Sequence, residues 1–256
     1  MVRLRLPSFR GCFGKGFAVV AGQIGGEERS CAGAQAADAP ELDLSSAAGA
    51  EALRAVSLVG ETLAPLFLAE PGCASAQAQL CALEAADACE FAAGWPFALE
   101  ADARRAIGLM QQGLAEPREG LTWEFRRLFI GPGHLVAPPW GSTYTDRDGV
   151  VFGDSHTRLV EFMRGNGIIR RVDEHTPVDH IGLMLHLMAW IADNRPEVLR
   201  EYLSKHLLTW SSHFLEGLAL HTESAFYQGL ALLTRTTLEG IGEVFAVDVE
   251  YPRYVR

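Results

Sequence analysis

Apolar residues recur at helical spacing along most of the chain from about position 48 onward. The first such stripe consists of Leu53, Val56, Leu63, Leu66 and Phe67. Residues three and four positions apart share one face of an α-helix, so this spacing predicts an amphipathic helix. The Ala-rich segments near 74–93 and 98–115 are also predicted to be helical, because alanine has the highest helix propensity.

The helical periodicity stops in the middle of the chain. The sequence WEFRRLFI, which begins at Trp123, predicts a short amphipathic helix. Residues 131–154 then contain three prolines and several glycines, a combination that an α-helix does not tolerate. This segment is expected to be an ordered loop that contains a short extended piece at residues 150–152.

Helices return after this loop. Ser155 is predicted to cap a helix that ends at the Gly-Asn-Gly sequence of residues 165–167. Thr176 is predicted to cap the next helix, with a proline at the first helical position and Asp179 three residues after the cap. That helix is predicted to end at Asn194, and three more are predicted near 196–208, 210–222 and 224–244. Strands and helices do not alternate, so the predicted fold is all-α, a single compact domain of about eight to eleven helices with a Pro/Gly-rich loop.

The first 46 residues differ from the rest of the chain. They are rich in Gly and Ala and lack helical periodicity, and their apolar run at Phe17–Ala21 is shorter than a secretory signal requires. Residues 1–46 are therefore predicted to be a disordered extension, or the product of a start codon placed too far upstream. Residues 47–256 are predicted to form the helical domain.

Composition and charge exclude several classes of protein. No apolar run approaches the roughly 20 residues of a membrane-spanning helix, which predicts a soluble protein. The formal net charge of −10 argues against nucleic-acid binding and is compatible with a cationic partner, although acidity for solubility alone explains it too. The chain contains no phosphate-binding Gly-x-x-x-x-Gly-Lys-Ser/Thr loop and no His-Glu-x-x-His pair, so neither a cofactor nor a metal site is predicted.

One motif suggests a hydrolase. VVFGDS, residues 150–155, resembles the nucleophile block of the GDS-type esterases, in which the serine corresponds to Ser155. Those enzymes also need an Asp-x-x-His pair near the C-terminus, which is absent here. The alternative interpretation is that Asp154 and Ser155 cap a helix.

Two short clusters suggest a peptide-binding site. The segment FRRLFIGPG…APPWG places Phe125, Phe129 and Trp140 near a proline corner, where aromatic rings lose little entropy on binding an apolar peptide. Trp140 could equally fill the core below the loop. In the second cluster, Asp179 can cap its own helix or pair with an arginine of a partner, and His180 can assist as a hydrogen-bonding or pH-sensitive neighbour.

Several blocks of sequence together resemble the TorD/DmsD family of twin-arginine leader-binding chaperones, in particular its dimethyl sulfoxide reductase type. The blocks are RLFIGPG (127–133), APPWGSTY (137–144), VVFGDS (150–155), Pro-x-Asp-His (177–180) and the helix of 181–194. The resemblance implies a cytoplasmic all-α protein without enzymatic activity. Such a protein binds the twin-arginine signal peptide of a molybdenum-cofactor oxidoreductase and delays its export until the cofactor is loaded, and components of the twin-arginine translocase are further possible partners.

The resemblance also implies a set of peptide-binding residues: Phe125, Leu128, Phe129, Pro139, Trp140, Pro177, Asp179 and His180. One departure concerns Phe125, where relatives carry a tryptophan that stands here two residues earlier, at Trp123. Two alternatives stay open. The first is an assembly chaperone of the nitrate-reductase type that acts on the apo-enzyme, and the second is the serine hydrolase that uses Ser155.

Overall fold

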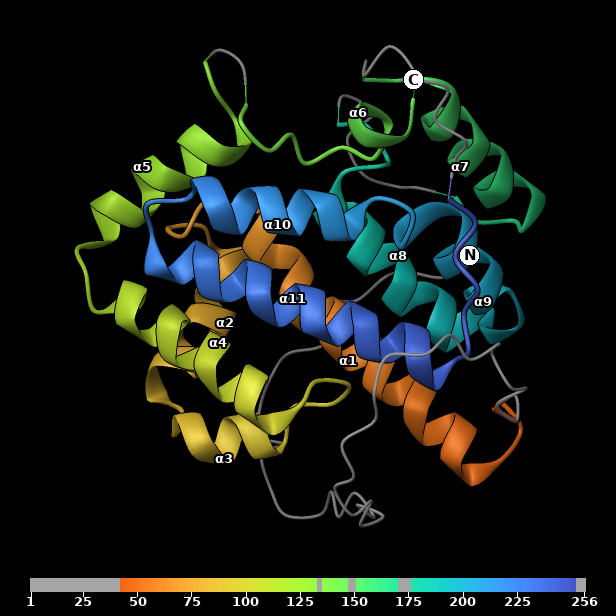
Figure 1. The fold of residues 1–256 in the computed structure, drawn as a ribbon, viewed down its shortest axis with the longest axis horizontal. Helices are drawn as coiled ribbons and strands as arrows, with labels where there is room; N and C mark the ends of the chain where they lie inside the picture. Colours follow the sequence, from red (N-terminus) through yellow and green to blue (C-terminus); the bar gives the residue numbers. More distant parts are fainter. Residues whose placement is uncertain (1–41, 133–134, 147–150, 170–175, 252–256) are drawn as a thin grey trace, which may run out of the picture. The chain divides into compact units, whose positions relative to one another are not determined.

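The computed structural model describes residues 42–132, 135–146, 151–169 and 176–251, which form helices joined by short connections (Figure 1). Within these ranges there are eleven α-helices, one 3₁₀ turn (η1, Pro196–Val198) and one π-helical turn (η2, Leu203–Leu207). The α-helices are α1 (Ala47–Leu68), α2 (Ala74–Ala85), α3 (Ala88–Ala93), α4 (Glu100–Leu114), α5 (Arg118–Phe129), α6 (Ser142–Thr145), α7 (Asp154–Gly165), α8 (Ile181–Asn194), α9 (Leu199–Tyr202), α10 (Ser211–His221) and α11 (Ala225–Val244). The predicted all-α fold is confirmed.

Three helix pairs organise the packing. Helix α1 lies against α8, α4 lies against α11, and α10 lies beside α11 (Figure 1). Two glycines allow close approach of the paired backbones. A Cβ atom on Gly60 of α1 would lie 2.6 Å from the carbonyl oxygen of Leu185, and one on Gly229 of α11 would lie 2.4 Å from that of Ala106. Any side chain at either position would force the paired helices apart.

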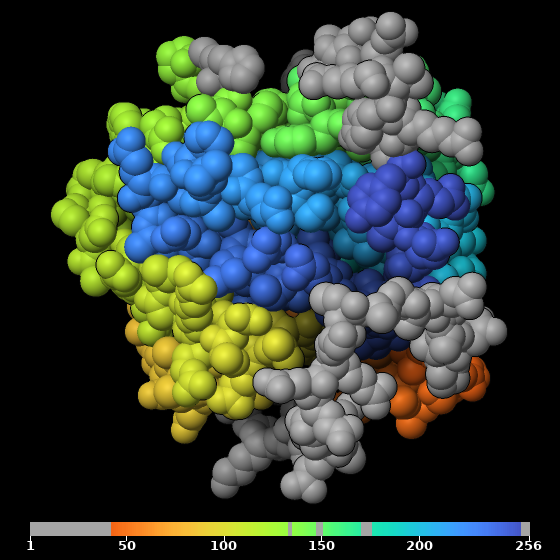
Figure 2. Space-filling view, in the orientation of Figure 1, coloured from red at the N-terminus to blue at the C-terminus, as the bar shows by residue number. Residues whose placement is uncertain are grey.

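One hydrophobic cluster fills the space between these helices. Figure 2 shows α10 and α11 as a blue band between the green side, which contains α5, and the yellow side, which contains α3 and α4. The largest buried side chains behind this surface include Phe67, Tyr202, Trp210, Phe214 and Phe226. Full burial of such a side chain stabilises the fold by roughly 1.5–3 kcal/mol.

The N-terminal helix begins close to the predicted boundary. Helix α1 starts at Ala47, and the hydroxyl of Ser46 caps it by accepting a hydrogen bond of 3.0 Å from the Gly49 amide. The predicted disordered extension over residues 1–46 stays a prediction, because residues 1–41 lie outside the described part of the chain.

Several elements differ from their predictions. The helical segment predicted at 74–93 is divided at Asp87, whose carboxylate caps α3 by accepting from the amides of Cys89 and Glu90. The segment predicted as one helix at 196–208 consists of η1, α9 and η2. Of the extended piece predicted at 150–152, residue 150 lies outside the described residues. Residues 151 and 152 form a turn, in which Phe152 has a φ of 67°.

The described residues contain neither a membrane-spanning helix nor a candidate metal-binding group. None of their helices combines the length and the apolarity that crossing a membrane requires. Nor do their His, Cys, Asp and Glu side chains form any group of three or more that could hold a metal ion.

Candidate functional site

The start of α8 lies four residues later than predicted. The helix begins at Ile181, and its N-cap is His180, whose Nδ1 accepts a hydrogen bond of 3.2 Å from the Gly182 amide. The prediction that Thr176 caps a helix whose first residue is Pro177 is therefore wrong. Residues 177–180 instead form a turn, in which the His180 amide donates to the Pro177 carbonyl at 3.2 Å.

A backbone bridge joins the two sequence clusters and explains this later start. Trp140 and His180 form an isolated antiparallel bridge. The Ile181 amide donates to the Pro139 carbonyl at 2.8 Å, and the Gly141 amide donates to the Asp179 carbonyl at 3.0 Å. Because the Asp179 carbonyl accepts from Gly141, it does not accept from the amide of Leu183, as it would in a helix that began at Pro177. The bridge brings Pro139, Trp140, Asp179 and His180 together, as the hypothesis of one site requires.

Asp179 is a buried carboxylate that is only partly satisfied. Its side chain is 3% exposed. Oδ2 accepts a hydrogen bond of 2.8 Å from the Ser142 amide at the start of α6, whereas Oδ1 has no hydrogen-bond partner. Leaving a buried acceptor unpaired costs about 1–3 kcal/mol, and more when the group is charged. Asp179 therefore does not cap α8, and its Oδ1 is a buried acceptor that lacks a donor.

Two aromatic residues and two prolines lie close to Asp179 along the two segments that the bridge joins. The rings of Trp140 and His180 meet edge to face, with centroids 6.2 Å apart and an interplanar angle of 75°. Trp140 is half-buried, and its Nε1 has no hydrogen-bond partner. Pro139 and Pro177 are buried on either side of the bridge, so their rings hold the backbone that presents Asp179.

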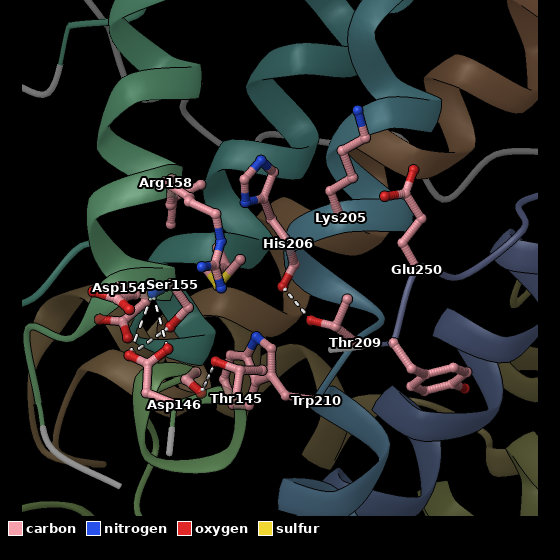
Figure 3. Close-up of a pocket in the computed structure, with 15 residues that line it drawn as sticks. Thr145, Asp146, Asp154, Ser155, Arg158, Lys205, His206, Thr209, Trp210 and Glu250 are labelled. Carbon is pink, nitrogen blue, oxygen red and sulfur yellow. Dashed lines mark hydrogen bonds between the residues drawn. The ribbon is translucent and has the colours of Figure 1, made fainter. Parts of the chain in front are cut away.

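A cleft of about 500 Å³ lies beside the bridge (Figure 3). Asp179 contributes to its lining together with residues of α6, α7, α8, η2 and the segment that follows α11. The charged groups of the lining are four carboxylates and two cations, which are Asp146, Asp154, Asp179, Glu250, Arg158 and Lys205. The formal excess of negative charge favours a cationic ligand.

His206 adds no positive charge to this lining at neutral pH. The pKa of its imidazole is lowered to about 4, mainly by burial; the charge of Glu201 raises this pKa, and the charges of Arg158 and Lys205 lower it. The ring lies 4.9 Å from that of Phe162, measured between centroids. The cleft therefore keeps its negative excess over the physiological range.

Ser155 makes the contact of a helix terminus and not of a nucleophile. Its amide donates to Asp146 Oδ1 at 3.0 Å, and its hydroxyl donates to Oδ2 of the same carboxylate at 3.1 Å (Figure 3). Helix α7 begins at Asp154 after Gly153, so the predicted cap by Asp154 and Ser155 is corrected: the cap is the carboxylate of Asp146. The described residues around Ser155 form no sheet, and its hydroxyl contacts a carboxylate where a hydrolase would place a histidine.

Three other predicted site residues lie on α5, and they are buried. Phe125 is 3% exposed, Leu128 is 1% exposed and Phe129 is 6% exposed. By contrast, Trp123 is 60% exposed, and the guanidinium of Arg127 lies 5.9 Å from its ring centroid. Trp123 is therefore the member of the pair that faces solvent. Direct peptide contact by the three buried residues stays a prediction, and it would require α5 to move.

A chain of ring contacts connects these buried residues to the cleft. Phe125 contacts Phe129, which contacts Phe67, which contacts Phe214, and successive centroids are 5.1, 6.1 and 6.2 Å apart. Phe214 in turn lies 5.9 Å from the ring of Trp210, which lines the cleft. The aromatic residues of α5 therefore belong to the packing that supports the cleft from behind.

Sequence reasoning did not find Ser142, His206, Trp210 or Glu250 as parts of this site. Ser142 is distinguished only by its position after a predicted loop, and the other three lie in segments whose pattern indicates ordinary helix or a polar tail. These residues come together through long-range contacts such as the bridge between residues 140 and 180. The local sequence pattern does not predict such a contact.

A known protein family matches the part of the chain that contains most of this site. The family model described as "Nitrate reductase delta subunit" matches residues 95–216. That range contains both halves of the bridge and most of the residues that line the cleft.

Two curated relatives are similar over a longer part of the chain, and a third is similar over a shorter part. The "Probable Tat proofreading chaperone DmsD" of Haemophilus influenzae is 40% identical over 163 residues, which cover 63% of this chain and 79% of that protein. The "Tat proofreading chaperone DmsD" of Salmonella paratyphi A is 42% identical over 58% of this chain and 72% of its own length. The "Chaperone protein TorD" of Ferrimonas balearica is 32% identical over 33% of this chain and 39% of its own length. On the extent and identity of these matches, the chain belongs to the TorD/DmsD family of chaperones.

Proposed function

We propose that this protein is a cytoplasmic chaperone, without catalytic activity, that binds the twin-arginine signal peptide of a molybdenum-cofactor oxidoreductase of the dimethyl sulfoxide reductase type. By holding the signal peptide, it would keep the client from the twin-arginine translocase until its cofactor is loaded. Membership of a family that includes Tat proofreading chaperones supports this function. Components of the translocase are further partners under the same proposal.

The observation that carries the proposal is the unpaired oxygen of Asp179. A buried carboxylate with a free acceptor needs a charged or strongly polar donor, and the excess of carboxylates in the cleft selects a cation. A guanidinium is suited to this position, because it donates several hydrogen bonds from one planar group and keeps its charge when it is desolvated.

The other predicted site residues would act on the same peptide in different ways. The rings of Trp140 and His180 contact each other at the bridge beside Asp179, and they would contact the arginine stem or stack on its guanidinium. Pro139 and Pro177 would fix the bridge. Phe125, Leu128 and Phe129 would receive the apolar part of the signal peptide if α5 opens, and they would otherwise support the cleft from the core.

The nitrate-reductase alternative concerns the identity of the client. The name of the matching family favours it, whereas the names of the relatives with 40–42% identity favour the Tat proofreading function. Signal-peptide binding and apo-enzyme binding require different contacts in the cleft. A chaperone that recognises only the folded surface of an apo-enzyme does not require an arginine at Asp179.

The test is titration calorimetry with a synthetic peptide that contains two consecutive arginines followed by an apolar stretch. Replacement of Asp179 by Asn keeps the size of the side chain and an acceptor for the Ser142 amide, but it removes the negative charge. We expect the Asp179→Asn variant to bind the peptide about 1.5–3 kcal/mol more weakly, which is the contribution of a charge-assisted hydrogen bond.

The matched control is a peptide in which glutamines replace both arginines. We expect the wild-type protein to bind this control peptide weakly, and the Asp179→Asn variant to discriminate poorly between the two peptides. Equal affinity of the wild-type protein for both peptides would contradict recognition of the arginine pair.

A further inference from the structure

The segment that follows α11 forms one wall of the cleft. After Phe245, which is buried, the chain turns back along the π-helical turn η2. The amide of Glu250 donates to the carbonyl oxygen of Ser204 at 3.1 Å, and the hydroxyl of Ser204 donates to the carbonyl oxygen of Asp248. We call residues 247–251 the C-terminal strap. Its violet-blue atoms lie on the molecular surface in Figure 2, so its side chains are accessible to a ligand.

The strap places the carboxylate of Glu250 across the cleft from Asp146 and Asp154 (Figure 3). In Figure 3, Asp146, Asp154 and Ser155 lie on one side, Lys205 and Glu250 lie on the opposite side, and Arg158 and His206 lie between them. Tyr251, which is 62% exposed, lines the cleft next to Glu250. A carboxylate beside an accessible aromatic ring is an arrangement that binds guanidinium groups through both charge and ring contact.

The carboxylate of Glu250 is free to accept an external donor. It forms no ion pair or hydrogen bond with the described residues. Lys205, which lies on the same side of the cleft in Figure 3, forms an ion pair of 3.1 Å with Glu201 on the preceding turn. Glu250 still lies close enough for its charge to raise the pKa of Lys205, after the larger effects of Glu201.

Asp146 and Asp154, which also line the cleft, are less available than Glu250 to bind an external cation. Both oxygens of Asp146 already accept hydrogen bonds from Ser155 at the start of α7. Asp154 is the first residue of α7, where the partial positive charge of the helix N-terminus already stabilises its negative charge. Glu250 neither accepts such hydrogen bonds nor lies at a helix N-terminus. Among the carboxylates that line the cleft, it alone belongs to the strap.

We propose that Glu250, presented by the C-terminal strap, is the second carboxylate of the peptide site and contacts one arginine of the pair while Asp179 contacts the other. This inference rests on the proposed function, because it assigns a subsite for the same ligand. Ser204 is a positioning residue, since it holds the strap against η2 through its carbonyl and its hydroxyl. Tyr251 stacks on the guanidinium that Glu250 binds.

The experiment is a set of double-mutant cycles on the full chain, measured by calorimetry at low and at moderate salt. The ligands are the two-arginine peptide and its variants with glutamine at the first, the second or both arginines. The protein variants are Glu250→Gln, Asp179→Asn, Asp154→Asn and Ser204→Ala. The control is Glu51→Gln, which removes one negative charge from an exposed position on α1.

We expect Glu250→Gln to weaken binding of the two-arginine peptide by roughly threefold to fivefold, with a smaller effect at higher salt, because Glu250 is solvent-exposed. The affinity lost in Glu250→Gln should require only one of the two arginines in the peptide, and the affinity lost in Asp179→Asn should require the other. Ser204→Ala should reduce the dependence on the arginine assigned to Glu250 and leave the dependence on the arginine assigned to Asp179 unchanged.

Different results would overturn the two proposals separately. If the wild-type protein does not distinguish the two-arginine peptide from the double-glutamine peptide, the proposed function fails. If the wild-type protein distinguishes them but Glu250→Gln behaves like Glu51→Gln, the subsite on the strap is wrong while the function stands. Dependence of one arginine on Asp154 in place of Glu250 would also overturn the subsite.

Discussion

At the scale of single residues, Gly141 connects the backbone bridge to the core. A Cβ atom at this position would lie 2.7 Å from Nε1 and 2.9 Å from Cε2 of Trp210, which is 2% exposed and cannot move aside easily. We expect Gly141→Ala to destabilise the protein by about 1–3 kcal/mol, the usual effect of overpacking, and to lower the thermal unfolding temperature.

The control for this prediction is Gly108→Ala. Gly108 lies within α4, and a Cβ atom there has no heavy atom within 4 Å. Because alanine favours helix over glycine by roughly 1 kcal/mol, this variant should be as stable as the wild type or more stable. If both variants unfold at the same temperature, the contact between residue 141 and Trp210 is not as tight as the structure describes.

Residue types indicated part of the site, but not its burial. The sequence singled out Asp179 as a carboxylate that caps a helix or meets an arginine, and Trp140 as an aromatic residue beside two prolines. It could not show that the donor to Asp179 is the amide of Ser142, 37 positions away. Helical spacing places Phe125 on the same side as Leu128 and Phe129, and all three are buried, but the sequence left open whether Trp123 or Phe125 faces the peptide.

At the scale of elements, the start of α7 depends on a residue outside the helix. Asp146 lies nine positions before Ser155 and accepts from both its amide and its hydroxyl. Loss of an N-terminal cap costs about 0.5–2 kcal/mol, so Asp146→Ala should destabilise the protein by this amount. Native-state hydrogen exchange should become faster at the first amides of α7, where the free energy of local opening falls.

Two further variants separate capping from other effects of this substitution. Asp146→Asn keeps a side-chain oxygen that can accept from the Ser155 amide, and asparagine is as good a cap as aspartate, so most of the stability should return. Ser155→Ala removes only the hydroxyl contact and should have the smaller effect. An equal loss of stability in Asp146→Asn and Asp146→Ala would show that the negative charge, and not the cap, stabilises α7.

Periodicity predicted the long helices well and their ends less well. The apolar stripes of α1, α4, α10 and α11 were visible because each of these helices buries one face over several turns. The start of α8 was misplaced, since the pattern Thr-Pro-Val-Asp satisfies the local rules for a cap, whereas the bridge to residues 139–141 commits this backbone elsewhere. The π-helical turn η2 was not predicted, because its sequence continues an ordinary helical pattern.

At the scale of the whole chain, the cleft is assembled from segments that lie far apart in the sequence. Its lining extends from Gly141 to Tyr251 and combines parts of four helical elements and the segments between them with the C-terminal strap. The net charge of −10 describes the chain as a whole, whereas the cleft concentrates carboxylates at one place through tertiary packing. Composition could therefore suggest a cationic partner but could not locate its site.

The buried imidazole of His206 makes the stability of the whole protein depend on pH. Burial lowers the pKa of His206 from 6.5 to about 4, so the unfolded chain takes up a proton at a higher pH than the folded protein does. The contribution of His206 to the free energy of unfolding is fully present above about pH 6.5. It decreases as the pH falls toward 4, and the loss is roughly 2 kcal/mol at pH 4.5. We expect His206→Gln, measured by urea unfolding, to lose less stability than the wild type between pH 7 and pH 4.5.

The control is His213→Gln, at an exposed position of α10, which should follow the wild-type pH profile. If His206→Gln and the wild type lose the same stability on acidification, other groups carry the pH dependence and His206 is not protected from protonation in the folded state.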